Sequence, residues 1–385
     1  MERDFGAHNE EVKLIWEAFQ AGKPVRVPMI IGCNVRALLL DPKLNKKKIT
    51  FKEYSENPDL MLEKQMEFQK WYRTSILQDA VMGVPAEGFN IDVDLQNYFE
   101  AAWFGCEINY REGQVPDTAP VLSGDRKNYL FDRGIPAPFS GLMEKNLRYY
   151  EYFKQKQKDN YRFEGIPVNS VRLSGMYTDG VMTGAINLRG MEFLTDFYED
   201  PDYVRKLFAY INRSTIARIK AFRKYLKEPE KSRGLFFADD SIALISTEMY
   251  REFVLPFHKE LIAELSDGDS NSIHLCGDAT RHFKLIRDEL KVRQFDTGFP
   301  VDFGGLRKEL GEGVTVYGGP NINLLLLKGA EEVSRETKRI LQSGIMEGGK
   351  FVIREGNNLA PATPQSNIKA MYDTVREFGK FPFSL

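Results

Sequence analysis

The chain has 385 residues, of which 42% are hydrophobic and 28% charged, and it carries a formal net charge of −2, so it can bury a large core as soluble globular proteins do. The lack of a basic excess excludes nucleic acid as a partner, and the short apolar runs, such as residues 37–40 and 324–327, exclude a membrane span. Three widely spaced cysteines, Cys33, Cys106 and Cys276, and an N-terminus without a secretory signal predict a cytoplasmic protein with no disulfide framework.

The first half of the chain gives separate helix and strand signals. Apolar residues at helical spacing, capping residues and short buried runs mark the elements. In chain order we expect a helix over residues 1–23, a strand over 25–31, a helix over 50–76, a strand near Phe89, a helix over 142–158, a strand over 168–173 followed by a glycine-rich segment over 175–190, and helices over 191–199 and 202–225.

The second half is more regular, because strands and helices alternate. We expect strands over 234–238, 272–276, 293–295, 314–317 and 351–353, each followed by a helix, over 247–265, 280–290, 303–310, 331–341 and 366–378. Parallel strands need such crossovers, so the alternation predicts a parallel sheet. With the earlier candidates the strand count approaches eight, which favours an α/β fold of the closed (β/α)8 type.

Side chains that carry chemistry follow the ends of these strands. They are Asp239, Asp240, His274, Cys276, Asp296, Glu355 and Asn357. Active sites of barrel enzymes lie at the carboxyl ends of the strands, so we expect these groups to converge on one mouth. His274 and Cys276 leave one strand on the same face and can be two ligands of zinc. The alternative is a half-buried histidine and a core cysteine, and any single aspartate can instead be a helix cap or an ion-pair partner.

The sequence resembles the uroporphyrinogen decarboxylase superfamily from about residue 25 to 379. The residues that carry the resemblance are 238–240, 245–256, 274–277, 317–321 and 367–371. This resemblance implies a (β/α)8 barrel in a single domain over 1–385, with residues 1–24 as an N-terminal helical extension and 25–379 as the barrel.

Two branches of this superfamily differ in residues that can be checked here. The decarboxylases hold the carboxylates of their tetrapyrrole with an N-terminal arginine cluster, whereas residues 29–36 keep at most Arg36. The corrinoid-dependent methyltransferases have His-x-Cys on one strand and a second cysteine after the last strand as zinc ligands. His274 and Cys276 match the first part, but residues 355–361 contain no cysteine. The resemblance therefore implies a zinc site that a carboxylate, Glu248, Asp239, Asp240 or Glu355, can complete. The alternative is that the metal is lost and His274 acts as an acid or base.

We expect a zinc-assisted methyltransferase that moves a methyl group between a small substrate and a separate corrinoid (cobalamin) protein. The aromatic residues between Phe89 and Tyr110 favour an aryl methyl ether as the substrate. The expected catalytic residues are Asp239, Asp240, His274 and Asp296; the expected zinc ligands are His274, Cys276, Glu248 and Glu355; and the expected substrate contacts are Arg36, Tyr177, Asn357 and Asn358. The alternatives are a decarboxylase of another substrate, and a non-catalytic barrel that binds a corrinoid or tetrapyrrole.

Overall fold

A computed structural model describes residues 5–381 of the chain. The strands are β1 (Phe89–Asp92), β2 (Glu107–Asn109), β3 (Asp117–Ala119), β4 (Arg162–Phe163), β5 (Ile166–Arg172), β6 (Phe236–Ala238), β7 (Asn271–Leu275), β8 (Val292–Thr297), β9 (Thr315–Gly318) and β10 (Phe351–Ile353). The five strands β6 to β10 form a parallel sheet in the order β10-β9-β8-β7-β6. A second sheet has the order β1-β5-β4, in which β1 and β5 are parallel, and β2 and β3 form a hairpin.

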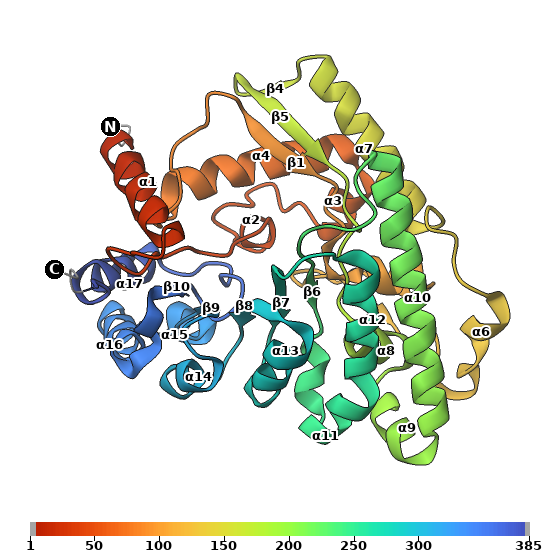
Figure 1. Cartoon of the computed structure of the whole chain (residues 1–385). Helices are drawn as coiled ribbons and strands as arrows, with labels where there is room; N and C mark the ends of the chain where they lie inside the picture. The colour runs from red at the N-terminus through yellow and green to blue at the C-terminus, as the bar shows by residue number, and fades with distance from the viewer. Residues whose placement is uncertain (1–4, 382–385) are drawn as a thin grey trace.

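Helices lie around the outside of the strands (Figure 1). They are α1 (Gly6–Gln20), α2 (Arg36–Leu39), α3 (Phe51–Glu56), α4 (Pro58–Ser75), α5 (Phe99–Trp103), α6 (Tyr129–Arg133), α7 (Leu142–Lys158), α8 (Val181–Arg189), α9 (Phe193–Glu199), α10 (Pro201–Leu226), α11 (Thr247–Met249), α12 (Leu255–Leu265), α13 (Phe283–Leu290), α14 (Phe303–Leu310), α15 (Ile322–Leu327), α16 (Ala330–Ile340) and α17 (Gln365–Phe378). Within the described part of the chain, no helix has the length and apolar character that a bilayer crossing requires.

The second half of the chain follows the predicted alternation closely, and the mixed α/β class is confirmed. The closed eight-stranded ring is not confirmed by the strand pairing, because the strands separate into the two sheets described above. Residues 25–31 form an isolated parallel bridge between Met29 and Ile353 instead of a ladder. The gap between β5 and β6 is crossed by a hydrogen bond from the Ala238 N–H to the Thr178 carbonyl, at 3.0 Å.

Side chains of α4 satisfy backbone groups of β1 and of residues 25–31. Gln65 accepts from the Asp92 N–H at 3.1 Å and donates to the Asp92 carbonyl at 2.5 Å. One turn later Gln69 donates to the Asn90 carbonyl at 2.8 Å, and Tyr72 donates to the Ile31 carbonyl on the opposite edge. Buried backbone groups need partners, so this helix takes the place of a strand pairing between β1 and residues 25–31.

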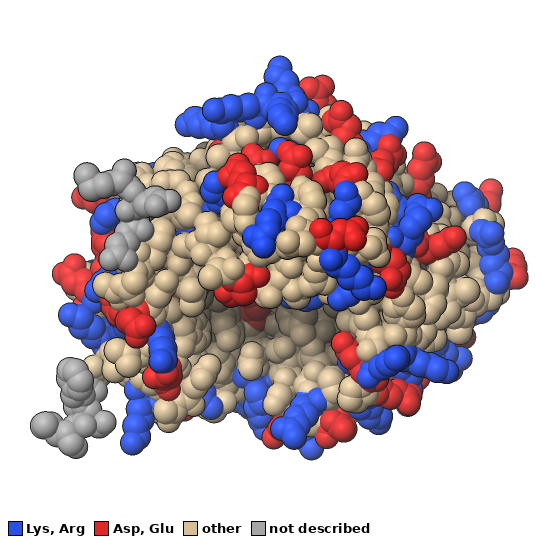
Figure 2. Space-filling model, turned by 90° about the horizontal axis from the view of Figure 1, so that it is seen from above, with Lys and Arg blue, Asp and Glu red and all other residues tan. Residues whose placement is uncertain are grey.

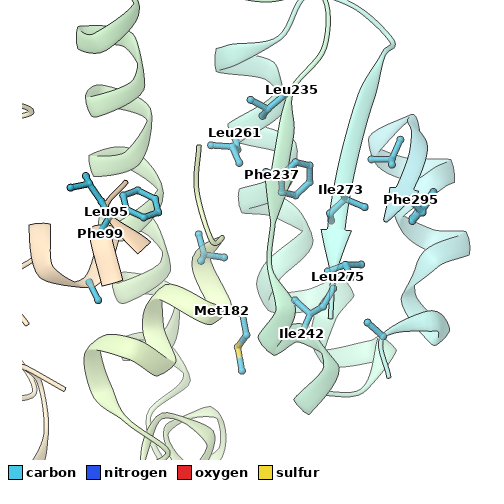
Figure 3. Packing of buried hydrophobic residues seen from close by; sticks show 14 of the residues in the cluster. Leu95, Phe99, Met182, Leu235, Phe237, Ile242, Leu261, Ile273, Leu275 and Phe295 are labelled. Atoms are coloured by element: carbon cyan, nitrogen blue, oxygen red, sulfur yellow. The ribbon is translucent and has the colours of Figure 1, made fainter. Parts of the chain in front are cut away.

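Alternation along the parallel strands separates a packed face from a functional face. Phe237, Ile273 and Phe295 are buried on the outer face of three neighbouring strands (Figure 3). Phe237 packs on the ring of His258 in α12. The register pairs Ala238 with His274 and His274 with Asp296 on the inner face. Successive side chains point to opposite faces, so the buried residues fix which residues can reach the interior.

Two local predictions differ from the structure for identifiable reasons. The helix expected over 50–76 is divided into α3 and α4, because Asn57 caps α4 through the Leu60 N–H and Pro58 begins the new helix. The glycine-rich segment over 175–190 contains the helix α8. The helix expected over 1–23 is observed as α1, and residues 1–4 lie outside the described part of the chain.

A buried ion pair joins three parts of the fold. The Arg218 guanidinium of α10 lies 2.7 Å from the Glu100 carboxylate of α5, and the two side chains are 0% and 3% exposed. The same carboxylate accepts hydrogen bonds from the Thr178 hydroxyl, the Asp179 N–H and the Thr215 hydroxyl, each at 3.0 Å. This ion pair therefore anchors the loop after β5 against α5 and α10.

We predict that Glu100→Gln lowers the free energy of unfolding by about 3–5 kcal/mol, because it leaves Arg218 buried without its counter-charge. Chemical denaturation of the variant beside wild type measures the difference. As the control, Asp373→Asn removes the exposed ion pair with Lys369 and should change the free energy by less than about 1 kcal/mol. Equal losses in the two variants would contradict the assigned role of the buried pair.

Candidate active site

Three different donor groups converge at the carboxyl ends of β6 and β7. They are a carboxylate oxygen of Asp240, a ring nitrogen of His274 and the Cys276 sulfur, and these atoms all lie within 4.8 Å of one another. All three residues are half-buried. These three residues therefore meet at neighbouring strand ends, as the sequence predicted.

Backbone contacts fix the Cys276 side of this donor group. The Cys276 N–H donates to an Asp240 carboxylate oxygen at 2.6 Å, which ties the end of β7 to the start of the short helix η3 (Asp240–Leu244). A Cβ atom on Gly298 would lie 2.4 Å from the Gly277 nitrogen, so the loop after β8 can pack here only with glycine at position 298. The position of the thiol is thus set by two neighbouring strand ends.

A chain of hydrogen bonds leads away from His274. Its Nδ1 lies 2.7 Å from an Asp296 oxygen and its Nε2 lies 3.0 Å from the Cys276 sulfur. Arg354, which follows β10, donates to the same Asp296 oxygen at 2.8 Å and to Glu355 at 2.6 Å. The other Glu355 oxygen accepts from the Gly32 N–H at 2.9 Å. The imidazole is therefore held in one orientation by a network that reaches residues 25–32.

The surroundings shift the pKa values of this network. Burial lowers the pKa of His274, but the hydrogen bonds with Asp296 and Cys276 outweigh burial and raise it to about 10. Burial raises the pKa of the Cys276 thiol, against the effect of the His274 hydrogen bond. Burial also raises the pKa of Glu355 to about 7, although Arg354 opposes this shift. Metal ligation needs neutral histidine and thiolate, so both side chains would release protons on binding a metal.

The donor group fits zinc. Cysteine sulfur, histidine nitrogen and carboxylate oxygen are its usual ligands, and catalytic sites use three protein ligands with a fourth position open. The contact between Asp296 and Nδ1 leaves Nε2 directed at the donor group, which is the arrangement that second-shell carboxylates produce at zinc histidines. The structure thus offers Asp240 as the third donor, among the four carboxylates that the resemblance implied.

The other three candidate carboxylates lie outside the donor group. Asp239 is fully buried, and its two oxygens are engaged by the N–H groups of Met182 and Thr183 at the start of α8 and by His258 at 2.9 Å. Glu248 is exposed on α11. Glu355 is bound by Arg354 and Gly32 as described above. In the described structure Asp239 and Glu355 thus bond to neighbouring protein groups, and Glu248 lies at the surface.

The expected substrate contacts lie around the same end of the strands. Arg36 and Tyr177 line one cavity of about 410 Å³, where Arg36 donates to the amide oxygens of Gln96 and Asn97, both at 2.7 Å. Asn357 and Asn358 are in the loop after β10, and the Asn357 carbonyl accepts from Arg354 at 3.1 Å. The sequence reasoning missed Arg354, although it stands directly between a predicted strand and Glu355.

Comparisons with known proteins show the family to which the chain belongs. The family model described as uroporphyrinogen decarboxylase (URO-D) matches residues 11–378. A methylated-thiol–coenzyme M methyltransferase of Methanosarcina mazei is 32% identical over 303 residues, which cover 77% of this chain and 74% of that protein. A uroporphyrinogen decarboxylase of Aquifex aeolicus is 25% identical over 183 residues, 47% of this chain and 51% of that protein.

A solved structure of a methyltransferase from Methanosarcina mazei shares the fold, with a TM-score of 0.64 over 95% of this chain and 98% of that chain at 18% sequence identity. The match to the family model covers nearly the whole chain, and the relative that aligns over most of its own length transfers methyl groups. The chain belongs to the uroporphyrinogen decarboxylase family and is an enzyme of its methyltransferase branch.

Proposed function

We propose that this enzyme transfers a methyl group between a small methylated substrate and a corrinoid carried by a separate protein, with zinc held by Asp240, His274 and Cys276. The observation that carries this proposal is the convergence of three zinc-type donors at the carboxyl ends of parallel strands. The names of two relatives support it. One acts on methylated thiols and coenzyme M, and a second, 20% identical over 200 residues, on methylcobamide and coenzyme M.

We also propose that the two sheets and residues 25–31 correspond to one (β/α)8 ring with two interrupted pairings. Met29 bridges to β10, and α4 side chains bond both edges of one interruption. In this arrangement all the parallel strands direct their carboxyl ends toward the same mouth. The loops that follow them then surround the donor group.

The residues of the site have distinct roles in this proposal. Asp240, His274 and Cys276 hold the metal, and Asp296 with Arg354 keeps the His274 ring oriented. When bound, zinc supplies Lewis acidity toward the heteroatom that gains or loses the methyl group, and a carboxylate in place of a second thiolate increases that acidity. The half-buried site limits access of water to the reacting atoms.

We propose a methyl ether, rather than a methylated thiol, as the substrate. An ether oxygen is a poor leaving group and gains more from a harder Lewis acid than a thiol does. The similarity to the methylated-thiol enzyme favours the thiol as a second candidate. The Asp240 carboxylate in the donor group is the feature that favours the ether.

We predict that the purified wild-type protein contains about one zinc per chain and that Cys276→Ala and His274→Ala lose it, because two donors hold zinc weakly. Elemental analysis after dialysis measures the content. Cys33→Ala, which removes a half-buried thiol outside the donor group, is the control and should keep its zinc. Unchanged zinc in both site variants would refute the assigned ligands.

Asp296→Asn should weaken zinc binding by roughly 10- to 100-fold, because the amide no longer fixes the tautomer and orientation of His274. Competition with a chromogenic chelator gives the affinity. The control is Asp302→Asn, which removes the exposed carboxylate that caps α14 in the loop after β8. An affinity equal to that of wild type would mean that Asp296 does not act on the metal site.

The proposed function is tested by mixing zinc-loaded protein with reduced cobalamin and either a methoxylated aromatic or a methylated thiol. We expect methylation of the cobalamin, seen in its absorption spectrum, with the methoxylated aromatic as the better donor. Loss of the reaction in Cys276→Ala should accompany loss of zinc. Transfer from neither donor, together with release of carbon dioxide from a carboxylated substrate, would instead favour a decarboxylase.

A further inference from the structure

Charged side chains of this protein lie mainly at the surface, and on the face shown in Figure 2 they surround a central hollow. Asp239 is an exception, because it is 0% exposed at the end of β6. A buried carboxylate is costly unless its oxygens have hydrogen-bond partners. The proposed metal site uses only the neighbouring carboxylate, that of Asp240, so the burial of Asp239 needs a separate explanation.

Two helices supply the partners of the Asp239 carboxylate. One oxygen accepts from the Met182 N–H at 3.1 Å and the other from the Thr183 N–H at 2.8 Å. These N–H groups belong to the first turn of α8, where a helix offers no partner of its own. From α12, the His258 ring contacts the same carboxylate at 2.9 Å and the Tyr250 hydroxyl at 3.0 Å. Asp239 therefore ties α8 and α12 to the end of β6.

The Thr183 hydroxyl extends these contacts past Asp240. It donates to the Asp239 carboxylate at 3.0 Å and accepts from the Ser241 N–H at 2.9 Å, and a hydroxyl can do both at once. Asp239 and Ser241 stand on either side of Asp240, so one hydroxyl holds the chain before and after this donor. The Asp240 carboxylate remains directed at the Cys276 N–H, at 2.6 Å, and at the donor group.

The packing between α8 and the end of β6 is close enough to maintain this bridge. A Cβ atom on Gly180 would lie 2.3 Å from the Asp239 carboxyl carbon, so α8 can begin here only with glycine at position 180. Met182 of α8 and Ile242 of η3 are fully buried where these two helices pack together (Figure 3). The Thr183 hydroxyl is thus held against residues 239–241 by a packed contact.

We propose that Thr183 is a positioning residue for the metal: together with Asp239 it directs the Asp240 carboxylate toward the zinc. This inference rests on the proposed zinc site and adds to it a residue of another helix. Hydrogen bonds behind a metal ligand set its orientation and thereby the metal affinity. The Thr183 hydroxyl has no printed contact with His274 or Cys276 and acts on the site through Asp240 alone.

The zinc affinity of the full-length protein, measured by competition with a chromogenic chelator, tests the inference. Thr183→Val keeps the branched shape without the hydroxyl and should weaken zinc binding roughly tenfold. Thr183→Ser keeps the hydroxyl and should bind zinc like wild type. Thr74→Val is the matched control, because it removes a half-buried threonine hydroxyl that bonds only within its own helix, α4. This control should also bind zinc like wild type.

Two further measurements separate positioning from a general loss of structure. In the Asp240→Ala background, the added Thr183→Val change should cause no further loss of zinc affinity, because the two residues act as one unit. The visible absorption of Co²⁺ bound in place of zinc depends on the ligand geometry. It should change in Thr183→Val and remain that of wild type in Thr183→Ser.

Thermal melting checks that each variant is folded, and Thr183→Ala takes the place of Thr183→Val if the valine variant does not fold. Wild-type zinc affinity and Co²⁺ absorption in the variant without the hydroxyl would overturn the inference and leave the zinc site standing. A further loss of affinity in the Asp240→Ala background, equal to that in wild type, would also overturn it. Absence of metal binding by the wild-type protein would instead overturn the proposed function itself.

Discussion

The arrangement of the candidate site depends on one charged residue, Arg354. Its guanidinium binds Asp296 near the end of β8 and Glu355 after β10, and through Glu355 it is linked to the Gly32 N–H. A buried guanidinium with two carboxylates is stable only when the geometry is close and the remaining groups are bonded. The Arg354 side chain also needs a glycine at position 32, because a Cβ atom there would lie 1.9 Å from an Arg354 nitrogen. The network therefore holds the ends of β8 and β10 and the segment at Gly32 together, and it orients His274.

Much of the fold could be predicted because its signals are local. Buried runs and amphipathic helices alternate from β6 to α17, so the strands and helices of the second half were predicted within a few residues. The interrupted pairings could not be predicted, since Gln65, Gln69 and Tyr72 replace strand partners through side-chain bonds that follow no hydrophobic period. Helix α8 was missed for a related reason. Its first N–H groups are capped by Asp239, a residue more than fifty positions away, and glycines obscure its own signal.

The residues of the site that lie at strand ends could be predicted from the sequence. His274, Cys276, Asp240 and Asp296 come together because the register places them on the inner face at neighbouring carboxyl ends. The sequence could not choose among the carboxylates. Asp239 and Asp240 are adjacent, but their side chains point in opposite directions. Asp239 contacts His258 in α12, whereas Asp240 accepts from the Cys276 N–H. The exposure of Phe236 beside the buried Phe237 has no sequence signal either.

The central claim is that a mixed set of one thiolate, one imidazole and one carboxylate holds the metal. X-ray absorption at the zinc edge of the full-length protein measures this set most directly. The account predicts a single sulfur neighbour at about 2.3 Å together with nitrogen and oxygen neighbours at about 2.0–2.2 Å, and loss of the sulfur signal in Cys276→Ala. A spectrum with two sulfur neighbours, or with oxygen and nitrogen neighbours alone in the wild-type protein, would contradict it.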